Sequence, residues 1–148
     1  MFKTILVAVH ASDQKHAVLL HAAEITRRFD ARLHLVSVFD LNQLWATKVP
    51  AGPEIFESLE AETRKFLADE QQQLDALGIT AQCHFMQGSV VDQIVLLAQQ
   101  LNADLVVMGH RYVSGLRRLL ERSAAKALID ESPCSVMIVR DDEEATSR

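Results

Sequence analysis

The feature of this sequence that most restricts its fold is an alternation of short apolar runs with longer amphipathic stretches. Five runs are rich in β-branched and other apolar residues, at 2–9, 32–39, 79–86, 104–108 and 135–139. Most of them lack the polar alternation of a half-exposed strand, as expected where helices cover both faces of a parallel sheet. Strands that alternate with helices predict βαβ units and therefore an α/β fold with a doubly wound parallel sheet.

Four helices are expected between these strands, and start and stop signals set their limits. Ser12 or Asp13 can cap a first helix that ends at residue 29, and Gly78 stops a second helix over 54–77. A capping box from Ser89 to Asp92 opens a third helix that ends at residue 101. Pro133 follows a fourth helix over 116–130. Residues 40–53 contain Gly52 and two prolines, which indicate a loop. The run 79–86 is the most polar of the five and is expected at a sheet edge.

Length and charge limit the classes of function. The chain has 148 residues, which fits one domain over 1–148, with residues 140–148 as a frayed charged tail. Its formal net charge is −5, whereas nucleic acids and anionic membranes attract basic surfaces. No segment approaches the roughly 18 apolar residues of a membrane span, and the N-terminal apolar run is too short for a secretory signal. We therefore expect a cytoplasmic protein without a nucleic-acid or membrane partner.

The expected fold also locates the candidate site. In doubly wound sheets, ligands bind beyond the carboxyl ends of the strands, where the strand order reverses. The residues that follow three of the expected strands are His10, Asp40 and the segment 109–111. This segment opens the stretch MGHRYVSGLRRLLERS, in which a glycine follows a strand and Ser123 comes later, as in some phosphate-binding loops.

Four stretches carry a resemblance to a known family. They are KTILVAVHAS, RLHLVSV, MQGSVVDQIVLLAQQLNADLVVMGHR and SAAKALIDESPCSVMIV, which together extend over nearly the whole chain. In these stretches the sequence resembles the universal stress proteins. The resemblance implies a Rossmann-like five-stranded parallel sheet in the order 3-2-1-4-5, with helices on both faces. It also implies a homodimer formed through the last strand, Ser135–Val139, and an apolar edge strand of this kind does invite pairing.

Members of this family that bind ATP carry the pattern G-x2-G-x9-G-[ST] after the fourth strand. Here Gly109 and Ser123 match it, whereas Tyr112 and Arg122 stand at the second and third glycine positions. Such members usually have an aspartate where this chain has His10. Glycine allows close approach to phosphates and positive φ, which Tyr and Arg allow less readily. The pattern therefore resembles the UspA-like branch, whose members are not regarded as ATP binders.

The candidate ligand-binding residues follow the first, second and fourth strands or match the nucleotide-binding positions. They are Val9, His10, Val38, Met108, Gly109, His110, Arg111, Arg122, Ser123 and Ala124. No catalytic residue or metal ligand is assigned among them, because the sequence has no Walker lysine, no GxGxxG, no HExxH and no G-x-S-x-G context.

Three groups of polar residues stand out, and the first two have both a functional and a structural interpretation. Basic side chains cluster at Arg111, Arg117, Arg118, Arg122 and Lys126, where they form either an anion site or a solvated helix face. His10 and His110, together with Asp40, form either a metal or acid–base site or a polar cleft wall. His34 and His84 are expected to form a polar pair across neighbouring strands.

The primary expectation for function is a cytoplasmic, homodimeric, non-enzymatic stress-response regulator of the UspA-like branch, with absent or weak nucleotide binding and no cofactor. The alternative is a universal stress protein that binds ATP or AMP and acts as a nucleotide-dependent sensor, for which slow ATP hydrolysis stays open. A third expectation, an enzyme acting on an adenylated or phosphorylated small molecule, is disfavoured because no general base or nucleophile pair stands out.

Overall fold

The computed structural model describes residues 1–10, 17–40, 52–110, 112 and 124–140. Within these ranges the chain forms one parallel sheet in the order β3-β2-β1-β4-β5. The strands are β1 (Thr4–Ala8), β2 (Arg32–Phe39), β3 (Ala81–Gln87), β4 (Leu105–Gly109) and β5 (Ser135–Val139), and the helices are α1 (Ala17–Phe29), α3 (Pro53–Ala76), α4 (Val90–Leu101) and α6 (Ala124–Glu131). The predicted fold class and strand order are confirmed.

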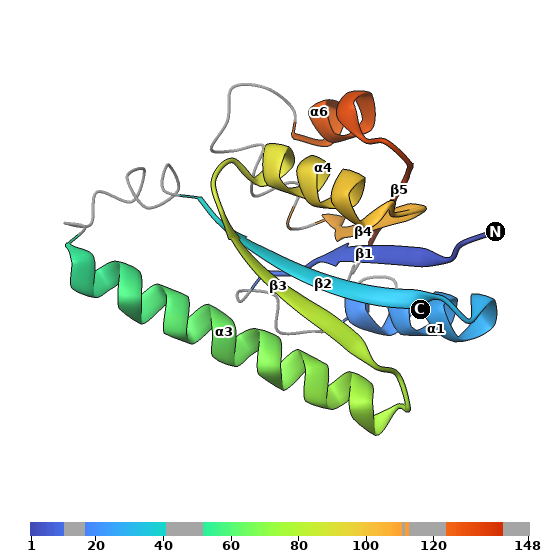
Figure 1. Ribbon diagram of the computed structural model, residues 1–148, viewed down its shortest axis with the longest axis horizontal. Coiled ribbons are helices and arrows are strands. Elements are labelled where there is room, and N and C mark those ends of the chain that lie inside the picture. Colours follow the sequence, from blue (N-terminus) through green and yellow to red (C-terminus); the bar gives the residue numbers. More distant parts are fainter. Residues whose placement is uncertain (11–16, 41–51, 111, 113–123, 141–148) are drawn as a thin grey trace.

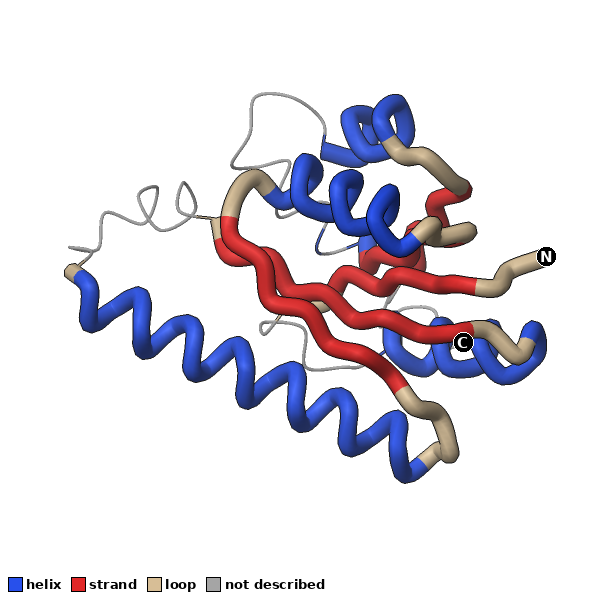
Figure 2. Tube along the Cα trace, viewed as in Figure 1, coloured by secondary structure: helices blue, strands red, loops and turns tan. Residues whose placement is uncertain are grey.

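The sheet lies between two helical layers, with α1 and α3 on one face and α4 and α6 on the other (Figures 1 and 2). Alternate residues of the central strand β1 face the two helical layers. Ile5 and Val7 belong to the apolar cluster under α1 and α3, and Leu6 and Ala8 belong to the cluster under α4 and α6. Both faces of β1 are therefore buried, which explains its lack of polar alternation.

The limits of two strands agree with the predictions and those of the other three differ. Strands β2 and β5 have the predicted limits. Strand β1 is shorter than predicted, at Thr4–Ala8 rather than 2–9, and β4 is shifted by one residue, at Leu105–Gly109 rather than 104–108. Strand β3 begins at Ala81 rather than at residue 79, because Ile79 still belongs to the end of α3, where its amide donates to the carbonyl of Leu74 at 2.9 Å. Gly78 ends that helix with φ 79°, the left-handed conformation expected of a helix C-cap glycine.

The predicted capping box at the start of α4 is wrong. Ser89 is the N-cap residue, but its side chain makes no capping hydrogen bond. Its backbone has φ −66° and ψ 130°, and its carbonyl accepts from the amide of Gln93 at 2.9 Å. The predicted starts of two other helices, at residues 12–13 and 116, lie outside the described residues.

Two thiols and a histidine pair lie on or beside the outer strands. Cys83 on β3 and Cys134 beside β5 are free, half-buried thiols at opposite edges of the sheet. His34 and His84 form the predicted cross-strand pair, with Nδ1 of His34 3.0 Å from Nε2 of His84. None of the described helices is both long enough and apolar enough to cross a bilayer.

Burial of the histidine pair makes stability depend on pH. Burial lowers the pKa of both His34 and His84, because desolvation penalises the charged rings, and the neighbouring histidine and Arg32 lower the pKa of His34 further. Below the ordinary histidine pKa of about 6.5, the unfolded chain therefore binds more protons than the folded protein. The contribution of the histidine pair to the free energy of unfolding is therefore present above this pH and is lost as the pH falls.

We expect the free energy of unfolding, measured by urea denaturation, to fall between pH 7.5 and pH 5.5. The variants His34→Gln and His84→Gln should each flatten this dependence, because each removes one titrating ring and the bond between the rings. An unchanged pH dependence in both variants would contradict the assignment.

Gly88 joins β3 to α4 in a conformation that other residues rarely adopt. Its φ is 140°, and its amide donates to the carbonyl of Phe39 at 3.0 Å, which ties the end of β3 to the end of β2. A Cβ atom placed here would lie 2.7 Å from the side-chain nitrogen of Gln93. Because Gln93 is flexible, the backbone conformation is the larger obstacle to substitution.

Gly88→Ala should therefore lower the free energy of unfolding by about 1–3 kcal/mol in chemical denaturation. Gly52→Ser is the matched control, because Gly52 is the N-cap of α3 with φ −98° and has open space around it. Serine is a favourable N-cap residue, so the control should be neutral or slightly stabilising. Equal losses in the two variants would refute the strain at Gly88.

Candidate functional site

The candidate site lies at the carboxyl ends of β1, β2 and β4, which are neighbours in the sheet. Ala8 of β1 is in register with Val36 of β2 and with Met108 of β4, so the residues that follow all three strands emerge at one edge. The amide of Val9 continues this pairing and donates to the carbonyl of Val36 at 2.9 Å. The reversal of strand order at β1 thus places the site where doubly wound sheets bind ligands.

The apolar candidate residues lie on different faces of the sheet. Val38 and Met108 are 4% and 1% exposed and belong to the cluster under α4 and α6. Val9 is 7% exposed and belongs to the cluster under α1 and α3. In this structure all three are core residues, so a ligand at this edge meets mainly the residues that follow the strands.

His10 and Tyr112 pack against each other at this edge. Their ring centroids are 5.3 Å apart and the planes are inclined by 31°. This distance is that of a direct aromatic contact. Tyr112 also packs against the apolar cluster that contains Val38 and Met108. The side chain of Tyr112 therefore lies between the histidine that follows β1 and the core under α4.

The surroundings of Tyr112 are apolar and negatively charged. Burial, and secondarily the carboxylate of Asp40, raise the pKa of its phenol far above the ordinary range, so the phenol stays protonated. Its hydroxyl is buried and has no hydrogen-bond partner among the described residues. Asp40, which follows β2, is itself only 5% exposed. A protonated hydroxyl and a buried carboxylate thus belong to one edge of the sheet.

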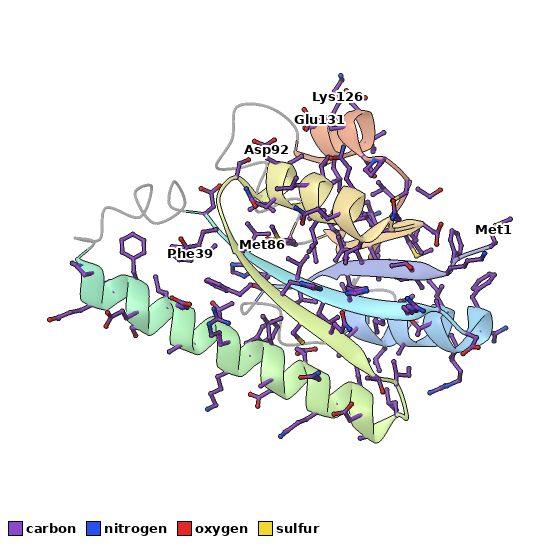
Figure 3. All side chains as sticks on the ribbon, in the orientation of Figure 1. Met1, Phe39, Met86, Asp92, Lys126 and Glu131 are labelled. Carbon is purple, nitrogen blue, oxygen red and sulfur yellow. The ribbon has the colours of Figure 1, made fainter. Side chains whose placement is uncertain are left out.

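A phenylalanine contact borders the site on the side of α3. Phe39, the last residue of β2, meets Phe56 in the first turns of α3 edge to face, with centroids 5.7 Å apart. Figure 3 labels Phe39 and Met86 at this edge of the sheet and Asp92 near the start of α4. The contact between Phe39 and Phe56 attaches the start of α3 to the end of β2.

The structure gathers some predicted site residues and leaves others undescribed. Gly109 ends β4 and is followed by half-buried His110. Arg111, Arg122 and Ser123 lie outside the described residues, as do Arg117 and Arg118, so the anion site stays a prediction. Ala124 is the first residue of α6.

Lys126 of the predicted basic cluster is on α6 and forms an exposed ion pair with Asp130 at 2.9 Å. Figure 3 labels this lysine on the outer side of the helix. Among the described residues, no group of three or more His, Cys, Asp or Glu side chains is placed to hold a metal ion.

Sequence reasoning missed Tyr112 as a contributor to the site, because it treated this position only as a lost glycine. The signal was present: an aromatic residue three positions after Gly109 has enough length to return to the strand ends. Tyr112 does not need a left-handed backbone, since the described non-glycine residues with positive φ are Asp30 and Asn102.

Comparison with known proteins identifies the relatives of this chain. The family model of the universal stress protein family matches residues 1–140. A universal stress protein of Methanocaldococcus jannaschii is 27% identical over 141 residues, which cover 95% of this chain and 83% of that protein.

Solved structures share the fold. A universal stress protein in complex with cAMP superimposes with a TM-score of 0.71 at 21% identity, covering 95% of this chain and 98% of that one. The universal stress protein of Archaeoglobus fulgidus in complex with dAMP gives a TM-score of 0.65 at 22% identity, covering 93% and 97%. With the match of the family model over residues 1–140, these findings show that the chain belongs to the universal stress protein family.

Proposed function

We propose that this protein is a cytoplasmic, homodimeric and non-enzymatic regulator of the stress response whose site binds adenine nucleotides weakly or not at all. The contact between His10 and Tyr112 is the observation that carries this proposal. It joins the end of β1 to the segment after β4, which is where family members that bind ATP carry their glycine pattern.

Tyr112 acts in this proposal by occupying space. Rings with centroids 5.3 Å apart are in direct contact, so no third ring fits between them. The phenol is also anchored in the core under α4, so moving it exposes apolar surface at a cost in free energy. A nucleotide that uses this position has to displace the tyrosine first, which weakens its apparent affinity.

The alternative, a nucleotide-dependent sensor, is favoured by a different observation. Two proteins of the same fold are in complexes with cAMP and dAMP, which makes adenine nucleotides the ligand class to test. The buried Tyr112 hydroxyl lacks a partner among the described residues and is a donor that such a ligand would satisfy. The two proposals differ in whether Tyr112 opposes the ligand or binds it.

Substitution of Tyr112 separates these proposals. We expect calorimetric titration of the wild-type protein with ATP, AMP and cAMP to show no binding tighter than millimolar, and Tyr112→Gly to bind at least one of them about tenfold or more tighter. Tyr112→Phe is the matched control, because it keeps the ring and removes only the hydroxyl. It should bind as weakly as wild type.

If the wild-type protein binds a nucleotide at micromolar concentration and Tyr112→Phe weakens this binding, the nucleotide-dependent sensor is favoured. The proposal that Tyr112 opposes the ligand is then contradicted. Release of adenine nucleotide on extraction of the purified wild-type protein would also favour the sensor. Thermal unfolding of each variant checks that it is folded at the temperature of the titration.

The proposed homodimer pairs the β5 strands of two chains. Strand β5 has β4 on one side and is the edge of the sheet on the other. Its three central residues, Val136, Met137 and Ile138, are apolar and half-buried. An apolar edge with unpaired backbone groups is stabilised by a second strand, and a two-fold axis lets identical strands pair with each other.

Met137→Lys should convert the dimer to a monomer in size-exclusion chromatography with light scattering. In an antiparallel pair centred on Met137, two lysines would face each other, and like charges directly opposite are destabilising. Met137→Gln is the neutral control and should remain dimeric. A wild-type protein that is monomeric at high micromolar concentration would refute the dimer.

A further inference from the structure

The buried histidine pair joins two neighbouring strands on one face of the sheet. Leu35 of β2 packs against the cluster under α1 and α3, so alternation along the strand places His34 on the opposite face, towards α4 and α6. Cys83 of β3 also packs against the cluster under α1 and α3, which places His84 on the same face as His34. The two rings therefore connect β2 to β3 on the side of the sheet that α4 covers.

Helix α3 and strand β3 are consecutive in the chain and form one end of the layered structure. Strand β3 pairs with β2 and has no strand on its other side within the described ranges. Helix α3 lies along β3 (Figure 1). Without this α3–β3 unit, residues 53–87, the strands β2, β1, β4 and β5 still pair with one another. Supersecondary units of this kind often open without unfolding of the whole protein.

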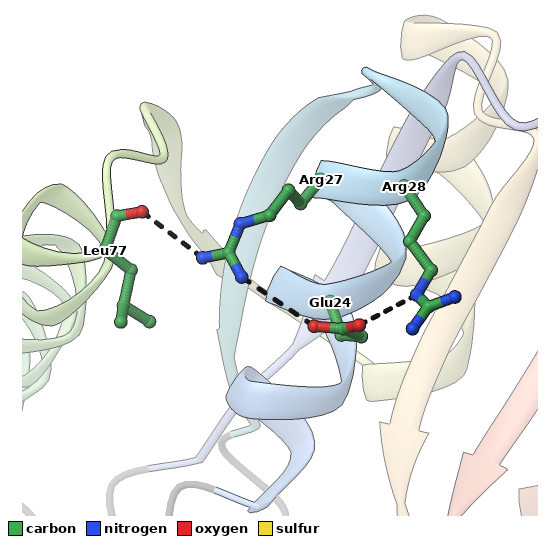
Figure 4. Close-up of polar contacts among 4 residues, drawn as sticks. All are labelled: Glu24, Arg27, Arg28 and Leu77. Atoms are coloured by element: carbon green, nitrogen blue, oxygen red, sulfur yellow. Dashed lines mark hydrogen bonds and ion pairs between the residues drawn. The ribbon is translucent and has the colours of Figure 1, made fainter.

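Backbone carbonyls hold the α3–β3 unit at its two ends. At one end Arg27 of α1 donates through Nη2 to the carbonyl of Leu77, just beyond α3, at 3.3 Å, and its Nη1 lies 3.7 Å from Oε2 of Glu24 (Figure 4). At the other end the amide of Gly88 donates to the carbonyl of Phe39 at 3.0 Å. The histidine pair lies between these ends, within the ladder that joins β3 to β2.

The contact between the two rings depends on their protonation. Nδ1 of His34 and Nε2 of His84 are 3.0 Å apart, so one nitrogen donates a proton to the other. A charged histidine carries a proton on both ring nitrogens. When both rings are charged, two N–H groups and two positive charges face each other at this distance. The hydrogen bond is then replaced by a repulsion.

The surrounding groups do not offset this charge within the described part of the chain. Arg32 adds positive charge next to His34 and lowers its pKa further. Strand β1, on the other side of β2, has no charged residue over Thr4–Ala8. The single charged residue of α4, Asp92, is in its first turn, near the carboxyl ends of the strands. Asp104 binds two backbone amides at the start of β1 at 2.8 and 2.9 Å.

The remaining helices are further from the pair. The acidic side chains of α3 belong to the opposite face of the sheet, and α6 lies beyond α4 as seen from β3 (Figure 1). Burial lowers the pKa of both rings, so the closed structure keeps them neutral at a pH where exposed histidines are charged. Proton uptake is therefore easier when the contact between β2 and β3 is broken.

We propose that the histidine pair is an acid-sensitive contact that holds the α3–β3 unit on the sheet. At neutral pH the uncharged rings join β3 to β2. In mild acid the open state binds more protons than the closed state, so the equilibrium shifts towards opening. Opening also separates Phe56 of α3 from Phe39, which borders the candidate site. The proposal depends neither on nucleotide binding nor on the homodimer.

The size of the effect follows from the balance of protons. A histidine with a pKa of about 6.5 in the open state that stays neutral in the closed state raises the opening constant about tenfold between pH 7.5 and pH 5.5. Two such rings raise it up to about a hundredfold.

Hydrogen exchange on the full chain, followed by NMR at pH 7.5 and pH 5.5, tests this proposal. Exchange rates that are corrected for the intrinsic effect of pH give an opening constant for each amide. We expect amides of β3 that bond to β2 to open more readily than amides of β4, and their opening constant to rise at least tenfold in acid. Low urea should change this opening less than that of β4, because local opening exposes less surface.

Histidine variants connect the effect to the pair. The double variant His34→Gln, His84→Gln should lose the rise in the opening constant of β3, because no titrating ring is left in the contact. His21→Gln is the matched control and should keep the full rise, because His21 is an exposed histidine on α1.

Two results would overturn the proposal. One is a common opening constant for the amides of β3 and β4 at both pH values, which indicates global unfolding alone. The other is an unchanged rise in the double variant. The comparison of β3 with β4 in the wild-type protein decides the proposal even if the double variant does not fold.

Discussion

The burial of β1 on both faces is the constraint on which the rest of this structure depends. Ile5, Leu6 and Val7 are fully buried, and burying a side chain of this size contributes about 1.5–3 kcal/mol. A strand buried on both faces needs a neighbour on each side and a helical layer above and below it. Parallel pairing with β2 and β4 supplies the two neighbouring strands. The helical layers are supplied by α1 and α3 on one face and by α4 and α6 on the other.

Parallel pairing gives the molecule two chemically different ends. The carboxyl ends of the strands lie near the start of α4, and the ends of α1 and α3 lie at the amino ends of the strands. The carboxyl edge is where the fold expects a ligand, and here Tyr112 packs between His10 and the core. The amino edge instead has a hollow of about 470 Å³, lined by the end of α1, the start of β2 and the turn between α3 and β3. The side chains that distinguish these ends decide what each can bind.

The sequence predicted the elements well where a single physical signal acted. The limits of β2 and β5 followed from apolar runs with clear boundaries. Prediction was less accurate at Ile79 and Ser89, because backbone hydrogen bonds at helix ends outweighed the preference of the side chain. For the site, the predicted edge agrees with the fold, but the role of Tyr112 depends on where its ring turns, which no spacing of residues specifies.

The sequence by itself determined the layered α/β fold, because hydrophobic periodicity is a local pattern and the allowed topologies are few. Its resemblance to the universal stress proteins supplied the strand order, and with it the pairing of His34 with His84. Only the tertiary structure decided that Tyr112 contacts His10 and that Arg27 of α1 donates to the carbonyl of Leu77, beyond the end of α3 (Figure 4). Such contacts join residues that are distant along the chain, and they depend on side-chain rotamers and on how two helices end beside a third segment. These properties depend on packing in three dimensions, which the sequence limits but does not specify by itself.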